Sequence, residues 1–264
     1  MLITAVANLK GGVGKTLVTG AVGHAFAAMG ERVLLVDVDP QGNLTQHFTS
    51  WTKDDPAPNS LADVLDPKTS VPIEDAIFGT RRAGIDIIPS GFAELQAVQD
   101  TLLGSTGAER RLKRVLDQLP DDYVHVLLDC RPATDLITRN AFMAADNLLV
   151  VIQPEFDAIA GLNQTLDAVD DLLEFVGKEL PIAGVVVNQI NVSRKDHANY
   201  LADIRSRADT DGLSVLCEIP AVADLSRLNV AGMGIDEYPQ ASPKLRYIAE
   251  QITGVADALG KVAS

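Results

Sequence analysis

The 264-residue sequence is poor in cysteine, in long apolar stretches and in positive charge. Its two cysteines, Cys130 and Cys217, form no C-x-x-C pair, so the pattern indicates neither a zinc site nor a disulfide framework. No uninterrupted apolar run approaches the ~18 residues that a membrane-spanning helix needs. The chain enters an apolar run at Leu2 without a basic leader. We therefore expect no secretory signal and a cytoplasmic protein.

Positive charge is scarce, since 22 Lys and Arg residues stand against 36 Asp and Glu residues, for a formal net charge of −14. Such a field repels nucleic acids and anionic membranes at long range. Any contact with DNA would therefore need a local basic patch. What the sequence has in quantity is hydrophobic residues, at 47% of the chain, which is enough for a sizeable core.

Apolar strand-like runs alternate with helical patterns along the whole chain. This alternation predicts an α/β fold, with one domain over residues 1–264 and a mostly parallel twisted sheet covered by helices on both faces. Strands are expected at 2–7, 32–39, 85–89, 124–129, 147–153, 182–188 and, at an edge, 214–219. Helices are expected at 60–65, 73–78, 92–103, 109–119 and 245–262, and another follows the segment 153–162 and ends at about 176.

The stretch from Asn8 to Thr16, N-L-K-G-G-V-G-K-T, joins the first strand to a helical segment. A glycine-rich turn at a helix N-terminus presents backbone N–H groups to a polyphosphate. Lys15 can reach the outer phosphates and the Thr16 hydroxyl can ligate Mg²⁺. The strict Walker A spacing fails, because its first glycine would fall at Leu9. We still predict a P-loop nucleotide site, with contacts from Lys10, Gly11, Gly12, Val13, Gly14, Lys15, Thr16 and Leu17.

Carboxylates follow two of the expected strands. Asp37 and Asp39 end the second strand, and Asp129 ends V-H-V-L-L-D. Strand carboxyl ends face the ligand crevice of an open parallel sheet, so these side chains should lie near the phosphates. An apolar strand with a terminal aspartate is the Walker B arrangement, which anchors Mg²⁺ beside the P-loop. Asp37 and Asp39 could instead cap the next helix.

Together, K-G-G-V-G-K-T and D-V-D-P-Q-G-N (37–43) resemble the deviant Walker A ATPases of the ParA/MinD family, and most closely the ParA/Soj-type partition ATPases. The resemblance implies a P-loop NTPase that uses ATP and Mg²⁺ and closes into an ATP-bound homodimer. Lys10 would cross the dimer interface to the partner's nucleotide, where a solvated loop lysine is the alternative. Thr16, Asp37 and Asp129 would hold Mg²⁺, and Asp39 would orient the attacking water.

The same resemblance implies plasmid or chromosome partition, with slow hydrolysis stimulated by a centromere-binding adaptor of the ParB type. It puts Glu155, in Q-P-E-F-D-A-I-A-G-L (153–162), near the dimer face, and Asn188 and Pro220 around the adenine. An asparagine offers the donor and the acceptor that an adenine edge requires. Both residues could also be ordinary strand terminators.

The family pattern changes in two places. Arg131 stands where a proline usually follows Asp-Cys, and Ala221 and Asp224 replace arginines that are usual near the last strand. Non-specific DNA binding by the ATP-bound dimer, and with it a nucleoid location, then depends on Arg194, Lys195 and Arg227. The basic segment 110–114 is either another nucleic-acid contact or a solvated face.

Two other functions remain open. A MinD-like division regulator would bind membranes through an amphipathic last helix, but a basic polar face is missing from 245–262, so we expect that helix to pack on the domain and form no stable membrane anchor. A metabolic ligase resembling dethiobiotin synthetase would need a substrate pocket and no Lys10.

Overall fold

The computed structural model describes residues 1–69, 71–191 and 193–262, and within them one eight-stranded sheet has the order β3-β4-β2-β5-β1-β6-β7-β8. Among the described strand pairs of this sheet, only β3–β4 is antiparallel, so the predicted α/β fold with a mostly parallel sheet is confirmed. The strands are β1 (Leu2–Ala7), β2 (Val33–Asp37), β3 (Phe78–Gly79), β4 (Ile85–Ile88), β5 (His125–Asp129), β6 (Asn147–Ile152), β7 (Ile182–Ile190) and β8 (Val215–Pro220).

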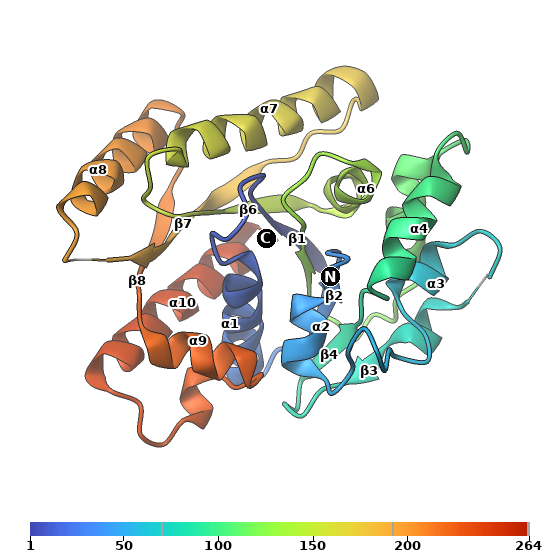
Figure 1. Cartoon of the computed structure of the whole chain (residues 1–264), viewed down its shortest axis with the longest axis horizontal. Helices are drawn as coiled ribbons and strands as arrows, with labels where there is room; N and C mark the ends of the chain where they lie inside the picture. Colours follow the sequence, from blue (N-terminus) through green and yellow to red (C-terminus); the bar gives the residue numbers. More distant parts are fainter. Residues whose placement is uncertain (70, 192, 263–264) are drawn as a thin grey trace.

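Helices cover both faces of this sheet, as Figure 1 shows. α7 and α8 lie on one side of it, and α1, α9 and α10 lie on the other. The helices are α1 (Lys15–Ala28), α2 (Asn43–Phe48), α3 (Leu61–Leu65), α4 (Ala93–Leu102), α5 (Arg111–Leu116), α6 (Leu136–Ala144), α7 (Ala158–Val176), α8 (Lys195–Thr210), α9 (Ala223–Val230) and α10 (Pro243–Val262), with 3₁₀ turns η1 (Ile73–Ala76), η2 (Ala108–Arg110) and η3 (Ile235–Glu237).

Two hydrophobic cores explain why the strands are apolar on both faces. Along β2, Leu34 and Val36 point into the core under α3 to α8, whereas Val33 and Leu35 point into the core under α1, α2, α9 and α10. Side chains alternate across a strand with a period of two, so both sets are buried only when helices cover both faces.

The last helix packs onto the sheet as predicted. Leu245, Ile248, Ile252, Val255 and Leu259 are each no more than 4% exposed, and α10 packs against α1 and β8. The apolar face of α10 is therefore buried in the core. None of the described helices is long and apolar enough to cross a bilayer.

Several element boundaries differ from the sequence-based expectation. The helix predicted at 109–119 is shorter, because the 3₁₀ turn η2 precedes α5 and α5 ends at Leu116. The helix predicted at 73–78 is also wrong: it is the 3₁₀ turn η1, and Phe78 belongs to the edge strand β3. Both segments are too short for hydrophobic periodicity to distinguish a turn from a helix. The sequence patterns do not predict α6 and α9, which follow Asp135 and Val222.

Candidate functional site

The P-loop joins β1 to α1 and is anchored to the distant strand β6 by the side chain of its own Asn8. Gly12 and Gly14 have φ values of +79° and +90°, which a residue with a Cβ adopts only with strain. The amide of Asn8 donates to the Val151 carbonyl at 2.7 Å, and its Oδ1 accepts from the Lys10 backbone at 2.8 Å. The loop is therefore fixed before any ligand binds.

Lys15 opens α1 and is only 7% exposed. Its Nζ donates to the Lys10 carbonyl at 3.2 Å, which folds the side chain back over the loop. Burial lowers the pKa of Lys15, and the charges of Asp129 and Asp39 oppose that shift. A buried ammonium at the N-terminus of a helix is suited to bind phosphate.

Asp37 and Asp129 face each other beneath the loop. They end the neighbouring strands β2 and β5 in direct register, and both are essentially unexposed. Asp129 accepts from the hydroxyls of Thr16 at 2.7 Å and Thr19 at 3.2 Å. Asp37 accepts from the Thr45 backbone at 2.8 Å and the Thr45 hydroxyl at 2.7 Å. Asp37 therefore also contacts the first turn of α2, as its alternative role predicted.

Burial is the main reason why the pKa of both carboxyls is raised, and the charge of Asp129 raises that of Asp37 further. Two buried carboxylates with an adjacent hydroxyl offer the hard oxygen ligands that Mg²⁺ takes. Among the described residues, no group of three or more His, Cys, Asp or Glu could hold a metal alone. A magnesium ion here would use Thr16, Asp37 and Asp129 together with water and phosphate oxygens, which is its usual coordination.

An open cavity of about 520 Å³ lies above these carboxylates. Asp39 lines it, and its Oδ1 is held by the Gln41 backbone at 2.9 Å, so it does not cap α2. The predicted residues Gly12, Gly14, Lys15, Thr16, Leu17 and Asp39 all line this cavity, and Gln41, Asn43, His47, Cys130, Arg131, Pro132 and Asn229 complete it. Sequence motifs from three strand ends thus converge on one site.

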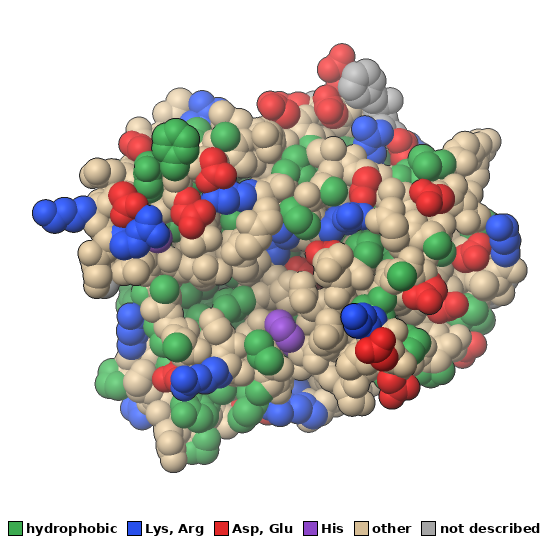
Figure 2. Space-filling model, viewed as in Figure 1, with side chains coloured by type: hydrophobic (Ala, Val, Ile, Leu, Met, Phe, Trp, Pro, Cys, Tyr) green, Lys and Arg blue, Asp and Glu red, His purple; other side chains and the backbone are tan. Residues whose placement is uncertain are grey.

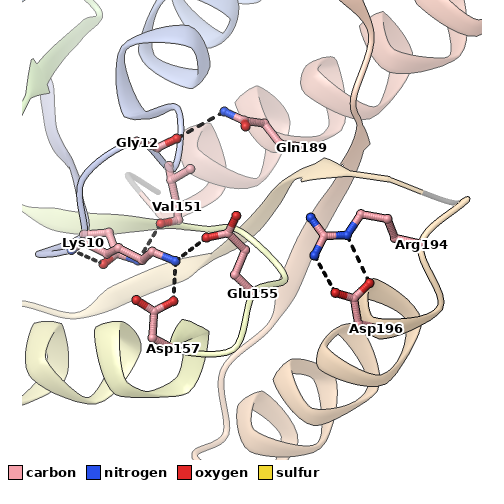
Figure 3. Close-up of polar contacts among 9 residues, drawn as sticks. Lys10, Gly12, Val151, Glu155, Asp157, Gln189, Arg194 and Asp196 are labelled. Carbon is pink, nitrogen blue, oxygen red and sulfur yellow. Dashed lines mark hydrogen bonds and ion pairs between the residues drawn. The ribbon is translucent and has the colours of Figure 1, made fainter.

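Lys10 turns away from this cavity toward acids of its own chain. Its Nζ donates to Glu155 at 2.6 Å and also bonds Asp157, and the three side chains converge in Figure 3. The carboxylates raise the pKa of Lys10 although burial opposes that shift. The solvated-lysine alternative is therefore wrong for this conformation. Glu155 was expected near the dimer face, which Lys10 was expected to cross, whereas no pattern in the sequence pointed to Asp157.

Asn188 and Pro220 lie at the ends of β7 and β8. The Asn188 amide is buried and donates to the Val13 carbonyl of the P-loop at 2.9 Å, and Gln189 donates to Gly12 at 3.3 Å (Figure 3). Asn188 approaches so closely that a Cβ on Gly14 would lie 2.2 Å from its Nδ2. Asn188 and Gln189 therefore adjoin the loop, and contact of Asn188 and Pro220 with adenine stays a prediction.

The three candidate DNA-binding residues lie at the start of α8 and on α9. Arg194 pairs with Asp196, and Arg227 pairs with Asp224 at 3.0 Å, while Lys195 is exposed. Over the α8 region in Figure 2, basic and acidic side chains are interspersed. In the segment 110–114, Arg111 bonds the Leu65 carbonyl and Lys113 pairs with Asp117. Neither region forms a continuous basic patch.

Sequence reasoning missed the residues that reach the site through tertiary packing. His47 of α2 and Asn229 of α9 bond each other at 3.1 Å in the wall of the cavity. They are 182 positions apart, and no local pattern could join them. Thr45 could have been found, since a hydroxyl in the first turn after D-V-D-P-Q-G-N lies within reach of Asp37.

Comparisons with known proteins agree with this geometry. The AAA_31 family model, described as an AAA domain, matches residues 1–182. The chromosome partitioning protein ParA of Caulobacter vibrioides is 35% identical over 206 residues, which is 77% of this chain and 75% of that protein. The structure of a Cyanothece McdA variant in complex with ATP has a TM-score of 0.85 at 25% identity, over 98% of this chain and 96% of that one.

A third similarity is to a cobyrinic acid a,c-diamide synthase from Mycobacterium smegmatis, whose structure holds an ATP analogue and magnesium. It is 31% identical, has a TM-score of 0.76 and covers 88% of this chain and 91% of that chain. A P-loop, a Walker B aspartate and an open parallel sheet define a P-loop ATPase. The chain belongs to the ParA/MinD-type family of P-loop ATPases.

Proposed function

We propose that this protein is an Mg²⁺-dependent partition ATPase that positions a plasmid, a chromosome or another large cargo. One observation carries the proposal: Lys15, Thr16 and Asp39 line a single cavity above the facing carboxylates Asp37 and Asp129. Phosphoryl transfer needs positioning and charge stabilisation more than covalent chemistry. The P-loop and Lys15 bind the phosphates, the carboxylates and Thr16 hold Mg²⁺, and Asp39 orients the attacking water.

The proposed cycle includes a homodimer that forms on ATP binding. Lys10 then leaves Glu155 and Asp157 and reaches the phosphates of the partner's nucleotide. The dimer binds DNA non-specifically through Arg194, Lys195 and Arg227, which associates it with the nucleoid in the cytoplasm. A ParB-type adaptor bound to the cargo stimulates hydrolysis and reopens the dimer.

The test is DNA co-sedimentation of the full chain with ADP, with ATP and with no nucleotide, beside sedimentation velocity to follow dimer formation. We expect dimers and DNA retention with ATP alone, both lost in Lys10→Ala and retained in Lys244→Ala, which removes an exposed lysine of α10. Dimers that retain no DNA would refute the DNA-bound cycle. A chain that binds no nucleotide would refute the ATPase.

A second candidate is a metabolic ligase, which the similarity to the diamide synthase favours. Such an enzyme would hydrolyse ATP only with a small acceptor present. Hydrolysis without any acceptor, raised by DNA and an adaptor, would argue against it. A MinD-like membrane regulator has less support, because the apolar face of α10 is already buried.

A further inference from the structure

Arg131 is a cation that lines the cavity beside the P-loop, although it lies outside the P-loop motif. It follows the Walker B residues Asp129 and Cys130 and is held at one edge by two acceptors. Its Nη1 donates at 2.7 Å to Gln96 of α4 and at 2.7 Å to Asp135, the N-cap of α6. Asp135 is fixed in turn, since its other oxygen accepts from the Thr138 backbone at 3.1 Å.

The other edge of the Arg131 guanidinium is free. A guanidinium has five N–H donors in a fixed fork. Within the described part of the chain, Nη2 and Nε of Arg131 have no hydrogen-bond partner, and Arg131 lines the same cavity as Lys15 and Thr16. The next residue, Pro132, also lines this cavity, and its ring lies 3.8 Å from where a Cβ on Gly11 would be. The turn that carries Arg131 therefore lies against the P-loop.

Within one subunit, few cations at the cavity oppose the charge of the incoming phosphates, so a further cation there is favourable. Lys15 is the P-loop ammonium that lines the cavity, because Lys10 is paired with Glu155 and Asp157. Asp39 adds negative charge to the same wall. A triphosphate therefore arrives where one lysine faces several acids. A planar guanidinium with two free donor nitrogens matches phosphate oxygens in a bidentate manner.

We propose that the free edge of Arg131 binds the terminal phosphate of ATP, while Gln96 and Asp135 hold its other edge. The inference rests on the proposed ATPase function and adds a specificity-determining residue to it. Arg131 then favours the triphosphate over the diphosphate before any second subunit arrives. It also links the nucleotide to α4 and α6, whose ends carry Arg131's two acceptors.

The experiment measures the affinity of the full chain for ADP and for a non-hydrolysable ATP analogue, both with Mg²⁺, by isothermal titration calorimetry. In Arg131→Gln we expect affinity for the analogue to fall about tenfold, because a charge-assisted hydrogen bond to phosphate is lost. Affinity for ADP stays within about twofold, as ADP lacks the phosphate concerned. Arg131→Lys retains part of the preference, since the charge remains without the fork.

The matched control is Arg139→Gln, an exposed arginine of α6 whose nearest acid is Glu109 at 3.6 Å. It should bind both nucleotides as the unaltered chain does, and circular dichroism should show all variants folded. Equal losses for ADP and the analogue in Arg131→Gln would mean that Arg131 only supports the turn. No loss for either would mean that its free edge binds no phosphate. An unaltered chain that binds neither nucleotide would overturn the proposed function itself, and this inference with it.

Discussion

Charged side chains are paired to different extents at the cavity beside the P-loop and on the surface of α8 and α9. At the cavity, Asp37 and Asp129 are buried side by side, and within one subunit Lys15 is the neighbouring cation that opposes the charge of Asp129. On the α8–α9 surface, Arg194 and Arg227 are exposed and each is paired with an aspartate close in sequence. Charge is therefore only partly compensated at the cavity, whereas it is compensated at these two positions of the α8–α9 surface.

This contrast is informative because the two kinds of charge have different energetic costs. A buried charge without a partner costs several kcal/mol, so a protein retains it where a ligand will supply the counter-charge. A solvent-exposed pair contributes roughly 0–1 kcal/mol and leaves little net charge for DNA. Uncompensated buried carboxylates therefore support the magnesium–nucleotide site, whereas the surface pairs weaken the case for strong DNA binding.

The sharpest test of the cavity is Asp39→Ala, for which we expect the largest effect. Removing the residue that we propose orients the attacking water should lower ATP hydrolysis about 10²- to 10⁴-fold, with ATP binding retained because Lys15 and the P-loop are unchanged. Steady-state phosphate release and nucleotide titration measure the two separately. Asp100→Ala, at an exposed position on α4, should leave both unchanged. Unaltered hydrolysis in Asp39→Ala would show that another group orients the water.

His24 tests whether burying a titratable group without a hydrogen-bond partner carries an energetic cost in this fold. Both of its ring nitrogens are without hydrogen-bond partners in the described chain, and Glu237 lies 3.6 Å from Nδ1. Burial lowers the pKa of His24 to about 4, despite the opposing charge of Glu237. The unfolded chain thus binds more protons between the ordinary histidine pKa of 6.5 and 4. Stability due to neutral His24 is complete above pH 6.5 and is lost as pH falls.

The matching experiment compares the unaltered chain with His24→Leu in urea unfolding at several pH values. A pKa lowered from 6.5 to about 4 corresponds to roughly 3 kcal/mol of stability, which the unaltered chain should lose between pH 6.5 and 4 beyond any loss in the variant. Parallel curves for the two proteins would mean that His24 is not kept neutral by burial. In that case an uncompensated group in this fold carries no measurable cost.

Asp129→Asn should show that the carboxylate pair is retained for a ligand and not for stability. The raised pKa means that ionised Asp129 destabilises the fold as pH rises through that pKa. The neutral amide removes the cost of burying the Asp129 charge and also its repulsion with Asp37, so at pH 8 without Mg²⁺ we expect stability to rise by about 1–2 kcal/mol. Mg²⁺-dependent ATP binding should fall. Thermal unfolding with and without Mg²⁺ measures both effects, and a less stable variant would contradict the account.

The sequence predicted what local patterns determine. The strands other than β3, and the convergence of Lys15, Thr16 and Asp39, followed from apolar runs and from the rule that parallel strand ends meet at one edge. It could not predict the Lys10–Asp157 pair or the bond between His47 and Asn229, because tertiary packing brings those elements together. It also could not predict that Asp224 pairs with Arg227, because residues three apart are neighbours only on a helix and α9 was not predicted.

The smallest expected effect concerns the Arg227–Asp224 pair. A change in DNA binding here would weaken the contrast between cavity and surface. Asp224→Ala frees Arg227 at a position that is 78% exposed. If Arg227 contacts a phosphate in the ATP-bound dimer, Arg227→Ala lowers the salt slope of DNA binding by about one, and Asp224→Ala strengthens binding at low salt. Retention on DNA measured between low and moderate salt, with ATP, separates these outcomes. If both variants behave like the unaltered chain, the Arg227–Asp224 pair is a neutral surface feature. DNA binding, where it occurs, would then depend on Lys195, Arg194 or a cation outside these three.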